Sequence, residues 1–139
     1  MTRYLLDTAP LGAYLLGRQG ARALITPWLR RDEAGTSILV CGEVIEHIMG
    51  RQDFLQKEEE LRRLLVRVAP YYVDYPVLQR YAELRRWLRP PHGPGLIGDI
   101  DTLLAATALR YDLTLVTTDT DFRRVPSLQL TLLHREELR

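Results

Sequence analysis

The chain has 139 residues, 46% of them hydrophobic, which predicts a single domain (residues 1–139) that can bury a core without disulfide bonds. Its formal net charge of +1 at pH 7 excludes a strong overall attraction for polyanions, so any nucleic-acid binding must be local. Because Cys41 is the only cysteine and no apolar run approaches the roughly 20 residues of a membrane span, we expect a cytoplasmic protein without a membrane segment.

The first half of the chain has the hydrophobic pattern of two short strands and three helices. The apolar run that begins near the N-terminus stops at Asp7, which is typical of a short buried strand followed by a polar loop. In chain order, we expect a strand at residues 3–6, helices at 11–16 and 21–31, a strand at 36–40 and a helix at 43–67.

The second half continues with strands that alternate with helices. We expect strands at residues 71–73, 113–116 and 128–133, helices at 76–88 and 102–111, and a loop at 90–95. This alternation is typical of a parallel sheet that helices cover on both faces. We therefore predict an α/β fold with three layers, α/β/α, around a central parallel sheet of about five strands.

Acidic residues stand where these strands end or where a helix begins. Asp7 follows the first predicted strand, and Glu43 lies three residues after the second. Asp119 and Asp121 follow the fourth, and Asp101 begins the helix that leads into it. Ligands of open parallel sheets bind beyond the carboxyl ends of the strands, where these acids would meet. Crowded carboxylates favour a hard divalent cation such as Mg²⁺ or Mn²⁺, which can activate water for phosphodiester hydrolysis.

Four motifs resemble those of the PIN-domain ribonucleases, and within them the VapC-type toxins of bacterial and archaeal toxin–antitoxin pairs. The motifs are YLLDT at residues 4–8, SILVCGE at 37–43, DTLLAATAL at 101–109, and LVTTDTDF at 115–122 followed by VPSL at 125–128. Each motif is short, but their order and spacing extend the resemblance over almost the whole chain.

The resemblance implies a catalytic acidic site for Mg²⁺ or Mn²⁺. Its residues are Asp7, Glu43, Asp101 and Asp119, with Asp121 as an accessory metal ligand. Thr8 and Thr117 occupy hydroxyl positions that orient the carboxylates, whereas Ala9 replaces an asparagine that many relatives carry. The resemblance further implies an RNA substrate, a VapB-like antitoxin as partner, and a homodimer.

Two other functions compete with this interpretation. Asp99 and Asp101 have the spacing of the DxD motif of haloacid-dehalogenase-like phosphatases. That motif needs its first aspartate at the end of an apolar strand, and the proline- and glycine-rich loop at 90–95 precedes it here. We therefore interpret Asp99, directly after Gly98, as a helix N-cap. The other alternative is a non-catalytic PIN-like binding module.

The remaining reactive or basic side chains have weaker patterns. Arg123 and Arg124 follow the acidic loop, where they would either contact RNA phosphates or lie free in solvent. The three histidines, His47, His92 and His134, lack metal-ligand spacing, and we assign none of them a catalytic role. Cys41 has no partner and is interpreted as a small buried apolar residue.

Overall fold

A parallel five-stranded sheet forms the centre of the computed structural model, which describes residues 1–139. The strands are β1 (Tyr4–Leu6), β2 (Ala34–Ser37), β3 (Ala69–Tyr71), β4 (Thr114–Thr117) and β5 (Leu130–Leu132). Their order across the sheet is β3-β2-β1-β4-β5, and every neighbouring pair is parallel. The predicted parallel sheet of about five strands is therefore confirmed.

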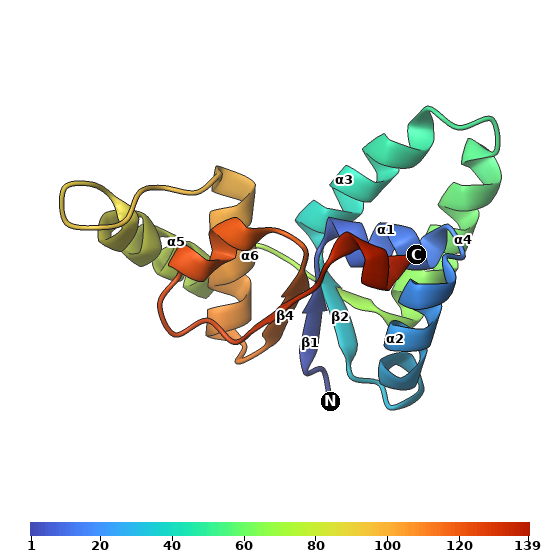
Figure 1. Ribbon diagram of the computed structural model, residues 1–139, viewed down its shortest axis with the longest axis horizontal. Helices are drawn as coiled ribbons and strands as arrows, with labels where there is room; N and C mark the ends of the chain where they lie inside the picture. The colour runs from blue at the N-terminus through green and yellow to red at the C-terminus, as the bar shows by residue number, and fades with distance from the viewer.

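Helices cover both faces of this sheet. They are α1 (Thr8–Leu15), α2 (Gln19–Arg30), α3 (Ile38–Met49), α4 (Phe54–Arg67), α5 (Tyr75–Leu88) and α6 (Asp99–Arg110), with two 3₁₀ turns, η1 (Thr120–Arg124) and η2 (Arg135–Leu138). Figure 1 shows α1 to α4 on one side of the sheet and α5 with α6 on the other, which confirms the three layers. No helix has both the length and the apolar character needed to cross a membrane.

The two central strands are buried on both faces. Leu5 and Leu6 of β1 and Leu115 and Val116 of β4 have no exposed surface. Strands covered by helices on both faces consist of continuous apolar runs for this reason, and each fully buried leucine contributes about 2 kcal/mol. The alanines of α6 are also buried, which lets this helix pack closely against its neighbours.

The boundary between β2 and α3 differs from the prediction. The strand expected at 36–40 ends at Ser37, and the apolar residues that follow open α3. The Ser37 hydroxyl accepts a hydrogen bond from the Leu39 amide at 3.1 Å, so Ser37 is the N-cap of the helix. A short apolar run fits a buried strand and a buried helix equally well, which is why the strand prediction for 38–40 was wrong.

Residues 43–67 form parts of two helices, so the prediction of one long helix was also wrong. Gly50 is the C-cap of α3, and α4 begins at Phe54. In the turn between them, the Arg51 Nε donates to Asp53 at 2.8 Å. The turn folds the chain back on itself, so α3 and α4 project together from one end of the molecule (Figure 1).

Candidate functional site

The strand order reverses between β1 and β4 at the centre of the sheet. The connections that leave these two strands diverge to opposite sides, which opens a crevice beyond their carboxyl ends. A groove of about 1120 Å³ lies there. The acidic residues that line it are Asp7, Glu43, Asp101 and Asp119. Four carboxylates that are far apart in the sequence therefore share one groove.

The Asp7 carboxylate is held from two sides. Asp7 follows β1 directly and is the N-cap of α1, and its Oδ1 accepts from the Thr8 amide at 2.7 Å. Its Oδ2 accepts from the Thr117 hydroxyl at the end of β4, at 2.6 Å. Because β1 and β4 are neighbouring strands, the sheet itself fixes the orientation of this side chain.

Glu43 reaches the groove from α3. It is an exposed residue in the middle of this helix. The Thr8 hydroxyl donates to Glu43 Oε1 at 2.9 Å, so the first residue of α1 restrains the glutamate of α3. Thr8 and Thr117 thus each hold one carboxylate of the groove.

The two aspartates at the start of α6 have different surroundings. Asp101, the third residue of the helix, is partly buried and lines the groove. Asp99, the first, accepts from Arg85 of α5 at 2.6 Å, and 71% of its side chain is exposed. Gly98 is the N-cap and no side chain caps the helix, so the prediction of Asp99 as N-cap was wrong. Neither aspartate ends a strand, which argues against the phosphatase arrangement.

Asp119 caps η1, the turn that follows β4. Its Oδ1 accepts from the Asp121 amide at 2.9 Å, and its own amide donates to the Thr117 hydroxyl at 3.0 Å. Asp121 is exposed and lies 3.7 Å from Arg124, which also donates to a backbone carbonyl in the loop before α6. Asp121, Arg123 and Arg124 do not belong to the lining of the groove.

The groove carboxylates lie close enough to influence one another. Burial, followed by the charges of neighbouring carboxylates with Asp7 foremost, raises the pKa of Asp101 to about 6. Burial also raises the pKa of Asp7, although the hydrogen bonds from Thr117 and the Thr8 amide lower it in part. The acidic end of the groove is therefore short of positive charge.

The chemistry of these donors fits a hard divalent cation. Carboxylate oxygens are the ligands that Mg²⁺ and Mn²⁺ prefer, and a bound cation would favour the ionised forms of Asp7 and Asp101. No group of three or more His, Cys, Asp or Glu side chains is arranged as a ready cage for a metal ion. Mg²⁺ needs no such cage, because it keeps several waters and binds through one or two carboxylates.

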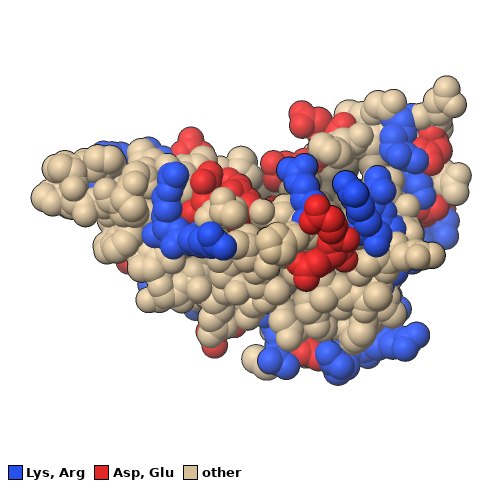
Figure 2. All heavy atoms as spheres, viewed as in Figure 1, with Lys and Arg blue, Asp and Glu red and all other residues tan.

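Basic residues line the other end of the same groove, and the sequence analysis did not identify them. They are Arg18, Arg51, Arg135 and Arg139, with His47 on α3 between the two ends. No sequence signal distinguished these arginines, because every basic residue except Lys57 is arginine. Figure 2 shows basic side chains gathered over the region where Figure 1 places α1 and η2, together with a smaller acidic group.

Comparisons with known proteins show the family and the fold of the chain. The family model of the PIN domain matches residues 4–128, which is most of the chain. Among curated proteins, no sequence matches.

Several solved structures share the fold. A chain of the VapBC2 complex of Rickettsia felis, bound to a DNA fragment from its promoter, is 22% identical with a TM-score of 0.81, and the match covers 96% of this chain and 100% of that one. A chain of DNA-bound VapBC from Salmonella typhimurium is 16% identical with a TM-score of 0.81, over 94% of this chain and 98% of that one. A chain of VapBC-1 from nontypeable Haemophilus influenzae is 23% identical with a TM-score of 0.77, with the same coverage.

Proposed function

We propose that this chain, which belongs to the PIN-domain family, is a metal-dependent endoribonuclease that hydrolyses RNA phosphodiester bonds. One observation carries the proposal: carboxylates from the ends of β1 and β4 and from α3 and α6 line one groove, at the point where the strand order reverses. Ligands of parallel sheets bind at such points, and crowded carboxylates there suit a divalent cation beside a phosphate.

The roles of the acids follow from their positions. The proposed ligands of Mg²⁺ or Mn²⁺ are Asp7, Glu43, Asp101 and Asp119, with Asp121 as an accessory acid. When bound, such a metal activates a water and offsets negative charge on the attacked phosphate. Thr117 and Thr8 hold Asp7 and Glu43 in place, so the chain itself supplies the orientation of these two carboxylates.

Purified protein with Mg²⁺ or Mn²⁺ is expected to cleave structured RNA, and EDTA is expected to stop the reaction. Asp7→Asn and Asp101→Asn each remove a charged ligand and should abolish cleavage. Asp99→Asn is the matched control, because Asp99 pairs with Arg85 outside the groove and its loss should leave cleavage intact. Equal activity in all three variants, measured on labelled RNA, would refute the proposal.

We further propose that the chain is the toxin of a VapBC-type pair, that a VapB-like antitoxin is its partner, and that it forms a homodimer. Support comes from the similar structures, which are chains of VapBC complexes and match over nearly their full length. Induced expression in a bacterium should arrest growth, and mapping of RNA 5′ ends should give cleavage sites that are absent with Asp101→Asn. Sedimentation at several protein concentrations tests the dimer, and a monomer at all of them would refute it.

The prediction that Arg123 and Arg124 contact RNA stays a proposal. Both are exposed and follow Asp121 in η1, although Arg124 already has partners within the chain. A substrate strand leaving the acidic end toward α6 would pass them.

A further inference from the structure

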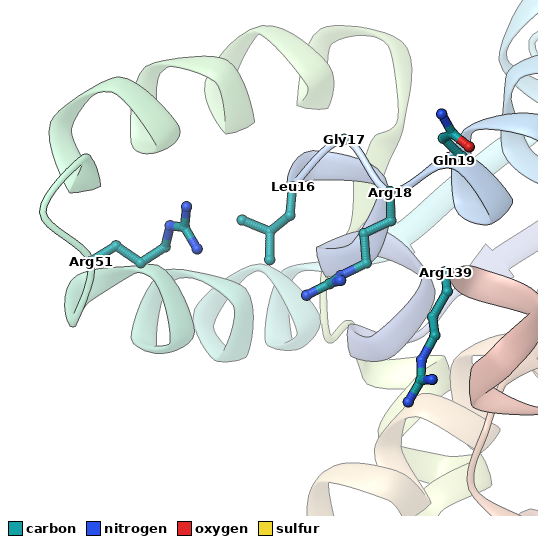
Figure 3. A pocket seen from close by; sticks show the side chains of 6 residues that line it. All are labelled: Leu16, Gly17, Arg18, Gln19, Arg51 and Arg139. Atoms are coloured by element: carbon teal, nitrogen blue, oxygen red, sulfur yellow. The ribbon is translucent and has the colours of Figure 1, made fainter.

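A second hollow of about 520 Å³ opens beside the groove, at its basic end. Its lining consists of Leu16, Gly17, Arg18, Gln19, Arg51 and Arg139. Figure 3 shows Leu16 between Arg51 and Arg18, with Arg139 on the far side of Arg18. Leu16 and the three arginines also line the groove, so the two hollows form one continuous depression. The arginines come from the α1–α2 turn, the α3–α4 turn and the end of η2.

Two of these arginines, Arg18 and Arg139, carry positive charge that no ion pair within the chain offsets. Arg18 and Arg139 are exposed and take part in no ion pair, while Arg51 pairs with Asp53. None of the three forms an ion pair with a carboxylate of the groove. The two glutamates of η2, Glu136 and Glu137, form no ion pair with these arginines, and Glu137 accepts from the His134 amide at 2.6 Å. Two unpaired guanidinium groups beside the paired Arg51 favour a bound anion at this hollow.

The backbone beneath two of these arginines is firmly positioned. Gly17 turns the chain with a φ of +76°, a conformation that favours glycine, directly before Arg18. The Gly20 amide donates to the Arg139 carbonyl at 2.8 Å. A Cβ atom at Gly20 would lie 2.2 Å from the carbonyl oxygen of Glu137, so α2 and η2 meet in direct backbone contact. This contact brings Arg139 beside Arg18, although the two residues are far apart in the sequence.

We propose that Arg18, Arg51 and Arg139 form a phosphate cradle, which binds the RNA backbone next to the phosphate that is cleaved at the acidic end. This inference rests on the proposed endoribonuclease function, because it names where the substrate strand of that enzyme lies. Arginine forks bind phosphate oxygens in pairs, and a nucleic-acid strand repeats its phosphates along its length. One strand can therefore place one phosphate among the metal-binding carboxylates and others among the arginines.

The acidic end of the groove favours RNA over an acidic peptide as the occupant. A peptide carboxylate that extended from the cradle would enter a region lined by the four carboxylates of Asp7, Glu43, Asp101 and Asp119. An RNA phosphate, in contrast, is a group that a divalent cation held by these carboxylates would bind. Because the arginines lie away from the cleaved bond, they contribute equally to ground-state and transition-state binding, and their loss changes KM rather than kcat.

The test is equilibrium binding of a fluorescein-labelled single-stranded RNA of twelve nucleotides, in EDTA so that no cleavage occurs. The double variant Arg18→Gln/Arg139→Gln should bind about tenfold or more weakly than wild type. The slope of log affinity against log salt should fall by about 1.4, because each phosphate contact to single strands contributes about 0.7. The control Arg86→Gln/Arg89→Gln removes the same charge from exposed, unpaired residues that line neither hollow, and should bind like wild type.

Cleavage with Mg²⁺ separates this inference from the proposed function. Weaker RNA binding by the double variant supports the cradle even if wild type cleaves nothing, in which case only the nuclease proposal fails. If wild type cleaves RNA and the double variant binds it equally well, the cradle alone is overturned. Wild type that does not bind RNA also overturns the cradle. Polyglutamate serves as the competing acidic ligand. If the double variant loses affinity for polyglutamate but keeps its affinity for RNA, the cradle is also overturned. In the supporting case, KM rises while kcat stays within about twofold.

Discussion

Asp7 shows how one residue joins three structural roles. It ends β1, caps α1 through the Thr8 amide, and presents its second carboxylate oxygen to Thr117 of β4. The cap and the contact with Thr117 use the two oxygens of the same carboxylate, whose pKa burial raises. The two hydrogen bonds offset part of this burial, so Asp7 depends on its neighbours to stay charged.

The hydroxyl of Thr117 is expected to matter for metal binding. Thr117→Val removes the hydrogen bond that orients Asp7 and the acceptor of the Asp119 amide. Loss of such a supporting bond typically lowers metal affinity about tenfold or more and costs about 1–2 kcal/mol of stability. Calorimetric titration with Mn²⁺ measures the affinity. Thr114→Val on the same strand is the control, since the Thr114 hydroxyl donates only to the Gln129 side chain, outside the groove. Equal affinity of both variants would contradict the prediction.

The raised pKa of Asp101 predicts how the metal-free protein responds to pH. The folded state holds a proton up to about pH 6, whereas the ordinary value is 3.8, so folding takes up a proton between these values. This contribution to stability is complete below pH 3.8 and is lost as the pH rises through 6. Because Asp101 is partly exposed, we expect a loss of about 1 kcal/mol relative to Asp101→Asn.

Urea unfolding in EDTA at about pH 4 and pH 7 measures this difference. The unfolding free energy of wild type should fall relative to that of Asp101→Asn as the pH rises. A parallel change in the two proteins would show that Asp101 titrates with its ordinary pKa.

At the scale of elements, the packing of α2 against η2 connects the C-terminal segment to the groove. Gly20 permits this packing because its missing side chain leaves room for the backbone of η2. Leu138 is buried, and the Gly20 amide donates to Arg139. The packing of α2 against η2 therefore fixes the position of Arg139.

Gly20→Ala is expected to displace η2 from α2. The added methyl group would meet backbone carbonyl oxygens at 2.2 and 2.7 Å, which cannot move as a flexible side chain would. We expect a loss of about 1–3 kcal/mol of stability and weaker RNA binding. Gly42→Ala in α3 is the control, because no atom lies within 4 Å of its added methyl group and alanine favours helix by up to about 1 kcal/mol. Equal urea unfolding midpoints of Gly20→Ala and Gly42→Ala would refute the prediction.

At the scale of the whole molecule, a net charge of +1 conceals a groove with two oppositely charged ends. Carboxylates gather beyond β1 and β4, and arginines gather beside α1, α2 and η2. The molecule as a whole therefore has no strong field for cations or polyanions, and the proposed binding of each depends on local geometry. A cation at the acidic end should also stabilise the fold, since it relieves repulsion that the folded state creates.

Removal of metal and its later addition test whether a bound cation stabilises the fold. Protein stripped with EDTA should gain about 2.7 kcal/mol of unfolding free energy when Mn²⁺ reaches a hundred times its Kd. Asp7→Asn and Asp101→Asn should abolish the gain, whereas Asp99→Asn should retain it. A protein whose melting temperature and calorimetric trace do not respond to Mn²⁺ would instead be a non-catalytic binding module.

The layered parallel sheet, and the acids that follow its strands, could be predicted from the amino-acid sequence alone. Alternating strands and helices form such a sheet, and the carboxyl ends of its strands share one edge, so residues such as Asp7 and Asp119 were placed by their distance from an apolar run. Local patterns also misplaced some boundaries, as at Ser37, because a short apolar run does not distinguish a buried strand from a buried helix.

Only the tertiary structure decided which side chains meet. The pairing of Asp99 with Arg85 depends on how α5 packs on α6, and no spacing in the sequence predicts it. The same holds for Arg18, Arg51 and Arg139, which come together from two turns and the end of the chain. The place of a carboxylate at the end of a strand follows from a local apolar pattern. A cradle of arginines follows from the packing of distant segments, which exists only after folding.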